Sequence, residues 1–280
     1  MGTKNAGARL TARMVTYGPL CVGIDPHPGL LDAWGLTRDA DGLRAFSDIC
    51  VRELDGAVAA LKPQVAFFET YGAAGIAALE ECIAFARAAG HFVITDAKRG
   101  DIGSTMAGYA AAYLAPGAPL ESDALTLSPY LGFGSLAPAI DLALQHDKGL
   151  FVLALTSNPE GVGVQHARTS AGSVAGDILT QAHEVNARIM AGDGSACGPI
   201  GSVVGATVGS APRDLGLDLA AFNGIHLAPG VGAQGAGGAE CRDVFGSSAM
   251  LASVSRGVLG AGPGQLKATA ERFVADLARA

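Results

Sequence analysis

The sequence has few charged residues and no cluster of positive charge. Asp, Glu, Lys and Arg make up only 16% of its 280 residues, and 26 acidic residues outnumber 19 basic ones, which gives a net charge of −7. Nucleic acids and anionic membrane surfaces bind proteins through clustered Lys and Arg, so we expect neither as a partner. An anion bound by this chain must be held locally, by a few residues.

Cysteine is scarce, and its spacing suits neither a disulfide framework nor a zinc site. The five cysteines, at positions 21, 50, 82, 197 and 241, are odd in number and include no C-x-x-C pair. The first residues lack an apolar signal segment, Ala6 stands where a myristoylation signal has Ser or Thr, and no apolar run reaches membrane-spanning length. We therefore expect reduced thiols in a cytoplasmic protein that is neither secreted nor inserted in a membrane.

Apolar residues (49%) and glycine (40 residues) are abundant, and the apolar runs alternate with helix-like stretches. The expected strands are 19–24, 59–68, 91–95, 123–127, 149–155, 200–206, 225–228 and 249–254. The expected helices are 42–58, 72–89, 102–115, 133–146, 172–190, 211–222, 239–245 and 265–280. Strict alternation over this length, with no linker-like break, predicts an α/β fold with a single (β/α)8 barrel domain spanning 1–280. A doubly wound open sheet is the alternative.

The most informative stretch is the charged segment after the apolar run 91–95. Side chains alternate along a strand, so Asp96 and Lys98 are predicted to point the same way and to pair. Gly100 allows a turn, and Asp101 then stands at the start of the next helix, where unpaired N–H groups favour a carboxylate. A solvated surface salt bridge is the alternative interpretation.

Lys62 is unusual because it lies inside an apolar run. A buried lysine needs a charged partner. In a barrel Lys62 would point inward, where Asp25 and Asp96 on the flanking strands could pair with it. The alternative is that the run is an edge strand or a loop.

The segment 229–238 is glycine-rich and contains a formal G-x-G-x-x-G at positions 230, 232 and 235. No acidic residue follows it by about 20 positions, as a dinucleotide site requires; Arg256 lies there instead. We interpret the segment as a backbone cradle for one phosphate, assisted by Gln234 and Arg256, since barrels often bind phosphate after strands seven and eight. A plain turn beside a surface arginine is the alternative.

Two other kinds of site are not supported. His27 has no second histidine at metal-ligand spacing, so no metal site is predicted. Ser157 is not part of a G-x-S-x-G elbow, so a serine triad is not predicted.

Together these motifs resemble the orotidine 5′-phosphate decarboxylase family, and in particular its long bacterial branch. The resemblance covers nearly the whole chain. It rests on the segments 23–25, 61–63, 96–103, 156–159 and 229–235 and on Arg256. The D-x-K-x-x-D core is shared with related barrel enzymes, including metal-dependent sugar-phosphate lyases. Lys62, the P-G-V-G-A-Q-G loop and the final arginine make the resemblance specific.

The resemblance implies a cofactor-independent decarboxylation of orotidine 5′-monophosphate to UMP, the last step of pyrimidine nucleotide synthesis, in a homodimer. It implies that Lys98 donates the proton, that Asp96 faces the leaving carboxylate, and that Lys62 and Asp25 complete a charged chain beside the ribose. Asp101 and Thr105 would reach into the neighbouring subunit's site. Ser157 would contact the pyrimidine, and Gln234 and Arg256 would bind the phosphate. A metal-dependent sugar-phosphate lyase and a non-enzymatic nucleotide-binding barrel remain as alternatives.

Overall fold

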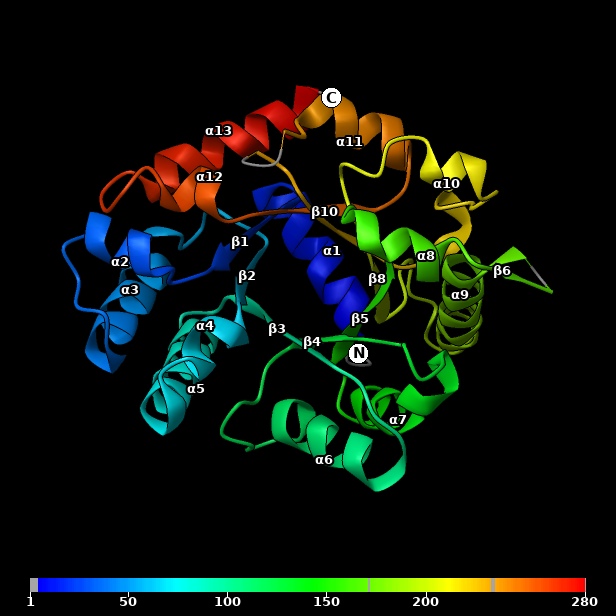
Figure 1. The fold of residues 1–280 in the computed structure, drawn as a ribbon, viewed down its shortest axis with the longest axis horizontal. Coiled ribbons are helices and arrows are strands. Elements are labelled where there is room, and N and C mark those ends of the chain that lie inside the picture. Colours follow the sequence, from blue (N-terminus) through cyan, green and yellow to red (C-terminus); the bar gives the residue numbers. More distant parts are fainter. Residues whose placement is uncertain (1–4, 171, 233–234, 280) are drawn as a thin grey trace.

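Eight parallel strands close into a barrel in the computed structural model, which describes residues 5–170, 172–232 and 235–279 (Figure 1). Around the barrel the strands follow the order β1-β10-β9-β8-β5-β4-β3-β2. Their bounds are β1 (Leu20–Ile24), β2 (Ala60–Pro63), β3 (Phe92–Arg99), β4 (Ala124–Leu127), β5 (Gly149–Leu155), β8 (Ile200–Val204), β9 (His226–Pro229) and β10 (Met250–Val254). The predicted barrel is confirmed, and the open sheet is excluded because β1 pairs with both β2 and β10.

Helices surround the barrel as an outer layer (Figure 1). The longer ones are α3 (Ala40–Glu53), α5 (Gly72–Ala88), α6 (Gly103–Leu114), α7 (Ala137–Gln145), α9 (Val174–Asp193), α11 (Gly238–Phe245) and α13 (Leu266–Arg279). Short helices α2 (Pro28–Ala33), α4 (Val65–Glu69), α8 (Val162–Gln165), α10 (Ala211–Asp214) and α12 (Arg256–Leu259) lie in the connections after strands. The same connections hold the 3-10 turns η1 (Phe133–Leu136), η2 (Pro159–Gly161) and η3 (Ala220–Phe222). A small hairpin, β6 (Arg168–Thr169) and β7 (Gly172–Ser173), lies between α8 and α9.

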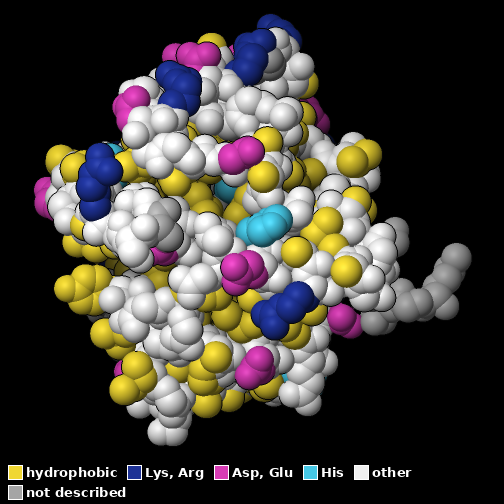
Figure 2. Space-filling view, turned by 90° about the vertical axis from the view of Figure 1, so that its right-hand side faces the viewer, with side chains coloured by type: hydrophobic (Ala, Val, Ile, Leu, Met, Phe, Trp, Pro, Cys, Tyr) yellow, Lys and Arg dark blue, Asp and Glu magenta, His cyan; other side chains and the backbone are white. Residues whose placement is uncertain are grey.

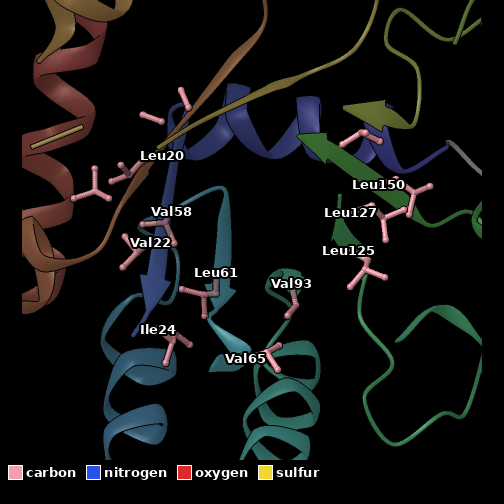
Figure 3. Packing of buried hydrophobic residues seen from close by; sticks show 14 of the residues in the cluster. Leu20, Val22, Ile24, Val58, Leu61, Val65, Val93, Leu125, Leu127 and Leu150 are labelled. Carbon is pink, nitrogen blue, oxygen red and sulfur yellow. The ribbon is translucent and has the colours of Figure 1, made fainter. Parts of the chain in front are cut away.

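Two apolar cores follow from the alternation of side chains along each strand. The outer core lies between strands and helices, where Leu20, Val22 and Ile24 of β1 pack beside Leu61 of β2 and Val93 of β3 (Figure 3). The inner core fills the barrel with the alternate residues of each strand, namely Cys21, Ala60, Phe92, Ile94, Ala124, Phe151, Val203, Leu227 and Leu251. Lys62 follows Ala60 by two residues, so it faces the barrel interior as predicted.

An N-terminal helix that was not predicted from the sequence closes one end of the barrel. Helix α1 (Ala6–Tyr17) begins at Asn5, whose side chain accepts a hydrogen bond from the backbone N–H of Ala8. Ala6 and Leu10 of this helix are buried and belong to the inner core. Its buried face adjoins Phe92, Ala124 and Gly149, the first residues of β3, β4 and β5, so α1 covers the N-terminal ends of the strands and leaves the opposite end as the site of function.

Several predicted boundaries are wrong. The strand expected at 59–68 ends at Pro63, and Val65 and Phe68 are buried three residues apart on a helix, α4. The helix expected at 211–222 is broken by Gly216, whose φ of 67° no helix allows. Strand β3 continues to Arg99, past the predicted end at Thr95, and α6 begins only at Gly103. The first four residues of the charged segment, 96–99, are therefore the end of β3.

The molecular surface carries dispersed charge. On the face drawn in Figure 2, Lys and Arg side chains are interspersed with Asp and Glu and form no concentrated positive patch. Among the helices of the described residues, none combines the length and the apolar character that crossing a membrane requires.

Candidate active site

The site is organised around the carboxylate of Asp96, which lies between two ammonium groups. Oδ2 of Asp96 is 2.6 Å from Nζ of Lys62, and Oδ1 is 2.6 Å from Nζ of Lys98. The side chains of Asp96 and Lys62 are 7% and 8% exposed, whereas that of Lys98 is 45% exposed. Both pairings predicted for Asp96 are therefore present, and the Lys62–Asp96 pair is buried rather than solvated.

Two uncharged donors complete the coordination of Asp96. Nε2 of Gln64 donates to Oδ2 at 3.0 Å, and the hydroxyl of Thr126 donates to Oδ1 at 3.0 Å. Each carboxylate oxygen thus accepts one bond from an ammonium group and one from a neutral group. This arrangement fixes the plane of the carboxylate, because rotating it would break all four bonds.

An irregularity in β3 explains how Asp96 and Lys98 come together. Thr95 is opposite Leu125 of β4, but the next paired residue, Arg99, is opposite Leu127, so three residues of β3 face the single residue Thr126. Lys98 adopts a φ of 47°, which a residue with a side chain rarely takes. Such a bulge re-aims side chains next to active sites, and here it directs Lys98 back toward Asp96.

Gly100 is needed for packing rather than for a turn. Its φ is not in the left-handed region, but a Cβ atom there would lie 2.2 Å from the carbonyl oxygen of Ser128. Any larger residue would push the end of β3 away from β4. The glycine therefore keeps the charged segment against its neighbouring strand.

The charges of the site hold one another in the ionised state. Burial opposes ionisation of Asp96, but the ammonium groups of Lys62 and Lys98 outweigh it and bring the pKa of Asp96 well below its usual value. Burial likewise lowers the pKa of Lys62, but the carboxylates of Asp96 and Asp25 more than compensate, and the net pKa is raised. Both groups are charged at neutral pH.

These residues open into a cavity of about 420 Å³ at the C-terminal ends of the strands. Its polar lining includes Asp25, Lys62, Gln64, Asp96, Lys98 and Arg256. Asp25 follows β1 and lines the cavity, but it makes no ion pair with Lys62 among the described residues, so only Asp96 supplies the close partner that was predicted for this lysine. Oδ1 of Asp25 is buried and accepts no hydrogen bond from the described residues. A ligand with a hydroxyl group could donate to it.

The other side of the cavity is formed by residues after β9 and β10, the seventh and eighth strands of the barrel, where the phosphate site was predicted. Gly230 and Val231 follow β9, and Arg256 is the first residue of α12 after β10. Gly230 and Gly232 have φ values of 101° and 79°, so the loop requires glycine at both positions. Arg256 is exposed and makes no ion pair within the described part of the chain. Gln234 lies outside the described residues.

Three predicted residues do not line this cavity. Ser157 is exposed in the loop after β5 and packs beside Gly205. Thr105 is exposed on α6, and Asp101 is half-buried ahead of it, with its carboxylate accepting from the N–H of Ile102 at 2.7 Å. Neither Asp101 nor Thr105 lines the cavity that Lys98 enters.

Gln64 and Thr126 contact Asp96 but were not identified from the sequence. Gln64 follows the end of β2, where the predicted strand had continued, so its position at the mouth was not apparent. Thr126 is a buried polar residue in an otherwise apolar strand, two positions before Ser128. A buried hydroxyl requires a hydrogen-bond partner, so a threonine inside an apolar strand was the feature of the sequence that could have identified Thr126.

No group of three or more His, Cys, Asp and Glu side chains in the described ranges is arranged to hold a metal ion. His27 lines the cavity, and its ring packs against that of Phe67 with centroids 4.2 Å apart. A second cavity, of about 300 Å³, lies between α9 and residues 215–222, and its described lining includes neither Lys nor Arg. The cavity at Asp96 is therefore the candidate for an anionic ligand.

Comparison with known proteins identifies the family of the chain. Residues 18–273 match the family described as orotidine 5′-phosphate decarboxylase / HUMPS. The orotidine 5′-phosphate decarboxylase of Salinispora arenicola is 53% identical, with 96% of each chain covered, and that of Streptomyces coelicolor is 52% identical, with 97% of this chain and 96% of the relative covered.

Solved structures show the same relationship. A crystal structure from Streptomyces avermitilis that carries a provisional orotidine 5′-phosphate decarboxylase name is 51% identical, with a TM-score of 0.92 over 100% of this chain and 96% of the other. The OMP decarboxylase of Leishmania donovani is 29% identical, with a TM-score of 0.73 and 99% and 98% coverage. The chain belongs to the orotidine 5′-phosphate decarboxylase / HUMPS family.

Proposed function

We propose that this protein decarboxylates orotidine 5′-monophosphate to UMP without a cofactor, the last step of pyrimidine nucleotide synthesis. The observation that carries the proposal is the Lys62–Asp96–Lys98 array in the cavity, with 2.6 Å between the carboxylate and each ammonium group. The family membership and the names of the relatives support the same activity.

The chemistry explains why an ammonium group is required. Loss of CO2 from C6 of the pyrimidine leaves a negative charge that the ring delocalises poorly, so the protein must stabilise a localised carbanion. An ammonium group fixed beside C6 does this electrostatically and then supplies the proton. Lys98 is the better candidate because its side chain lines the cavity and is 45% exposed, whereas that of Lys62 is 8% exposed.

Asp96 has two roles in this proposal. Its bond with Lys98 aims the ammonium group, and its negative charge faces the carboxylate that leaves, which is thereby destabilised in the bound substrate. Lys62 keeps Asp96 ionised and in place.

The remaining contacts of the substrate follow from the cavity. The unpaired Oδ1 of Asp25 accepts from a ribose hydroxyl. Arg256 and the backbone after β9 bind the phosphate, together with Gln234. Ser157 contacts the pyrimidine once the loop after β5 closes over it. Phosphate binding far from C6 provides energy that organises the site.

We further propose that the active form is a homodimer in which Asp101 and Thr105 enter the partner's site. Four of the large apolar side chains exposed among the described residues lie on α6 and its start (Ile102 and Tyr109) or in the loop after β4 (Tyr130 and Leu131), where the N–H of Ser128 donates to the carbonyl of Arg99. Exposed apolar groups gathered in this way favour association, here with a second copy of the chain. We place the enzyme in the cytoplasm, where its five buried, unbonded cysteines remain reduced.

The test is the ultraviolet absorbance of orotidine monophosphate, followed with and without a chelator. We expect turnover that is unaffected by the chelator. Loss of activity in chelator would favour a metal-dependent sugar-phosphate lyase, and UMP binding without an absorbance change would favour a non-enzymatic nucleotide-binding protein.

The Lys98→Ala variant tests the residue assignment. It should lose the decarboxylation rate by several orders of magnitude, because both the electrostatic stabilisation and the proton are removed, while still binding UMP. Turnover close to that of the wild type would refute the role of Lys98.

A further inference from the structure

The buried hydroxyl of Thr126 contacts both halves of the charged array. Thr126 lies in β4 and is 1% exposed. Its hydroxyl donates to Oδ1 of Asp96 at 3.0 Å and accepts from the backbone N–H of Lys98 at 2.9 Å. One oxygen atom therefore links the carboxylate to the backbone of the lysine that pairs with it.

These two bonds fall where β3 departs from regular pairing. The register places Thr126 alone opposite Asp96, Ala97 and Lys98. Lys98 has a φ of 47°, a conformation that is unfavourable for a residue with a side chain and persists only where its surroundings impose it. The bond from the Lys98 N–H to Thr126 is one such constraint, because it fixes the backbone from which the side chain projects.

The two roles of the hydroxyl are coupled. Its single proton is committed to Asp96, so its lone pairs face the Lys98 N–H. The ammonium of Lys98 meets the same Oδ1 atom at 2.6 Å. The three groups form a closed ring, in which moving either the carboxylate or the lysine backbone breaks the contact with Thr126.

We propose that Thr126 is a positioning residue for the decarboxylation, which sets the direction of the Lys98 ammonium group through Asp96 and the Lys98 backbone. This inference rests on the proposed function. Thr126 does not line the cavity, so it acts on the reaction only through the two residues that it holds.

The experiment compares Thr126→Val, which removes the hydroxyl and keeps the shape, with Thr126→Ser, which keeps the hydroxyl. Thr126→Val should lower kcat roughly 10- to 100-fold, because it removes a hydrogen bond to a charged group that aims the reacting lysine. KM and the Kd of UMP should stay within about threefold of wild type. Thr126→Ser should recover kcat to within about threefold of wild type on the same argument.

Thr95 supplies a matched control. It is a threonine of the adjoining strand β3 and is fully buried, but its hydroxyl has no hydrogen-bond partner among the described residues. Its neighbours Ile94 and Asp96 face the barrel interior, so Thr95 faces the helices. Thr95→Val should keep the kcat of the wild type.

Each outcome decides the inference. Any one of three results would overturn it: a Thr126→Val enzyme with wild-type kcat, a Thr126→Ser enzyme as slow as the valine variant, or a loss of kcat in Thr95→Val equal to that in Thr126→Val. A parallel loss of UMP binding and thermal stability would also overturn it, by assigning Thr126 to the fold alone. Absence of turnover in the wild type would instead refute the proposed function.

Discussion

Replacing Lys62 with methionine tests whether the buried ion pair is an integral part of the fold. The substitution removes the ammonium group and keeps most of the apolar stem. Asp96 would keep its bonds with Lys98, Gln64 and Thr126 but would lose the buried one of its two cationic partners. Lys98 would then be the single cationic partner of this carboxylate, which is 7% exposed.

The expected cost can be worked from this geometry. Removing one partner of a buried ion pair destabilises a protein by about 3–5 kcal/mol. Because Lys98 remains on Asp96, we expect the lower end, about 3 kcal/mol at pH 7. For a chain of this size such a loss corresponds to a decrease of roughly 6–12 °C in Tm.

The measurement is urea unfolding at pH 7 of the wild type, Lys62→Met and the double variant Lys62→Met/Asp96→Asn. The double variant removes the buried negative charge as well, so it should recover at least half of the loss, and the exposed Lys98 stays hydrated. A single variant that loses less than about 1 kcal/mol, or a double variant less stable than the single one, would refute the reasoning.

Two further predictions concern other parts of the molecule. His226 is fully buried between Ser202 and the carbonyl of Leu219, and burial lowers its pKa from 6.5 to about 4. Its neutral form is therefore favoured in the folded state, so stability should decrease by roughly 3 kcal/mol as the pH falls from about 6.5 to about 4. Unfolding measurements on His226→Gln should lose this part of the pH dependence, and an unchanged profile would refute the assignment. For the proposed dimer, mixing inactive Lys98→Ala and Asp101→Ala proteins should restore some activity through hybrid dimers that contain one intact site; no restoration despite subunit exchange would place the whole site within one chain.

The barrel and the core of its site were predictable because each has a local pattern. Runs of Val, Ile, Leu and Phe at regular intervals predict buried parallel strands, and Lys62 inside such a run predicts a buried partner. The pairing with Asp96 then follows from strand order, since β2 and β3 are neighbours. These inferences need only side-chain alternation and the cost of an unpaired buried charge.

The parts that were missed depend on tertiary geometry. The bulge in β3 has no marker in the sequence, because Lys98 adopts its positive φ only where Thr126 and Asp96 hold it. Helix α1 had a readable start in Asn5 and apolar residues four apart, Ala6 and Leu10, but what it covers becomes clear only with the closed barrel. Strand β2 was overextended because Val65 and Phe68 are as apolar in a helix as in a strand.

The seal that α1 makes on the barrel determines the exit route of the gaseous product. Between α1 and the inner core the remaining void is about 10 Å³, lined by residues such as Leu10, Phe92 and Phe151. That is no more than the space that one water molecule needs, about 10–15 Å³. In the proposed reaction, carbon dioxide released beside Lys98 is larger than water and finds no room at this end, so the open side of the 420 Å³ cavity, by which the nucleotide arrives, is its way out.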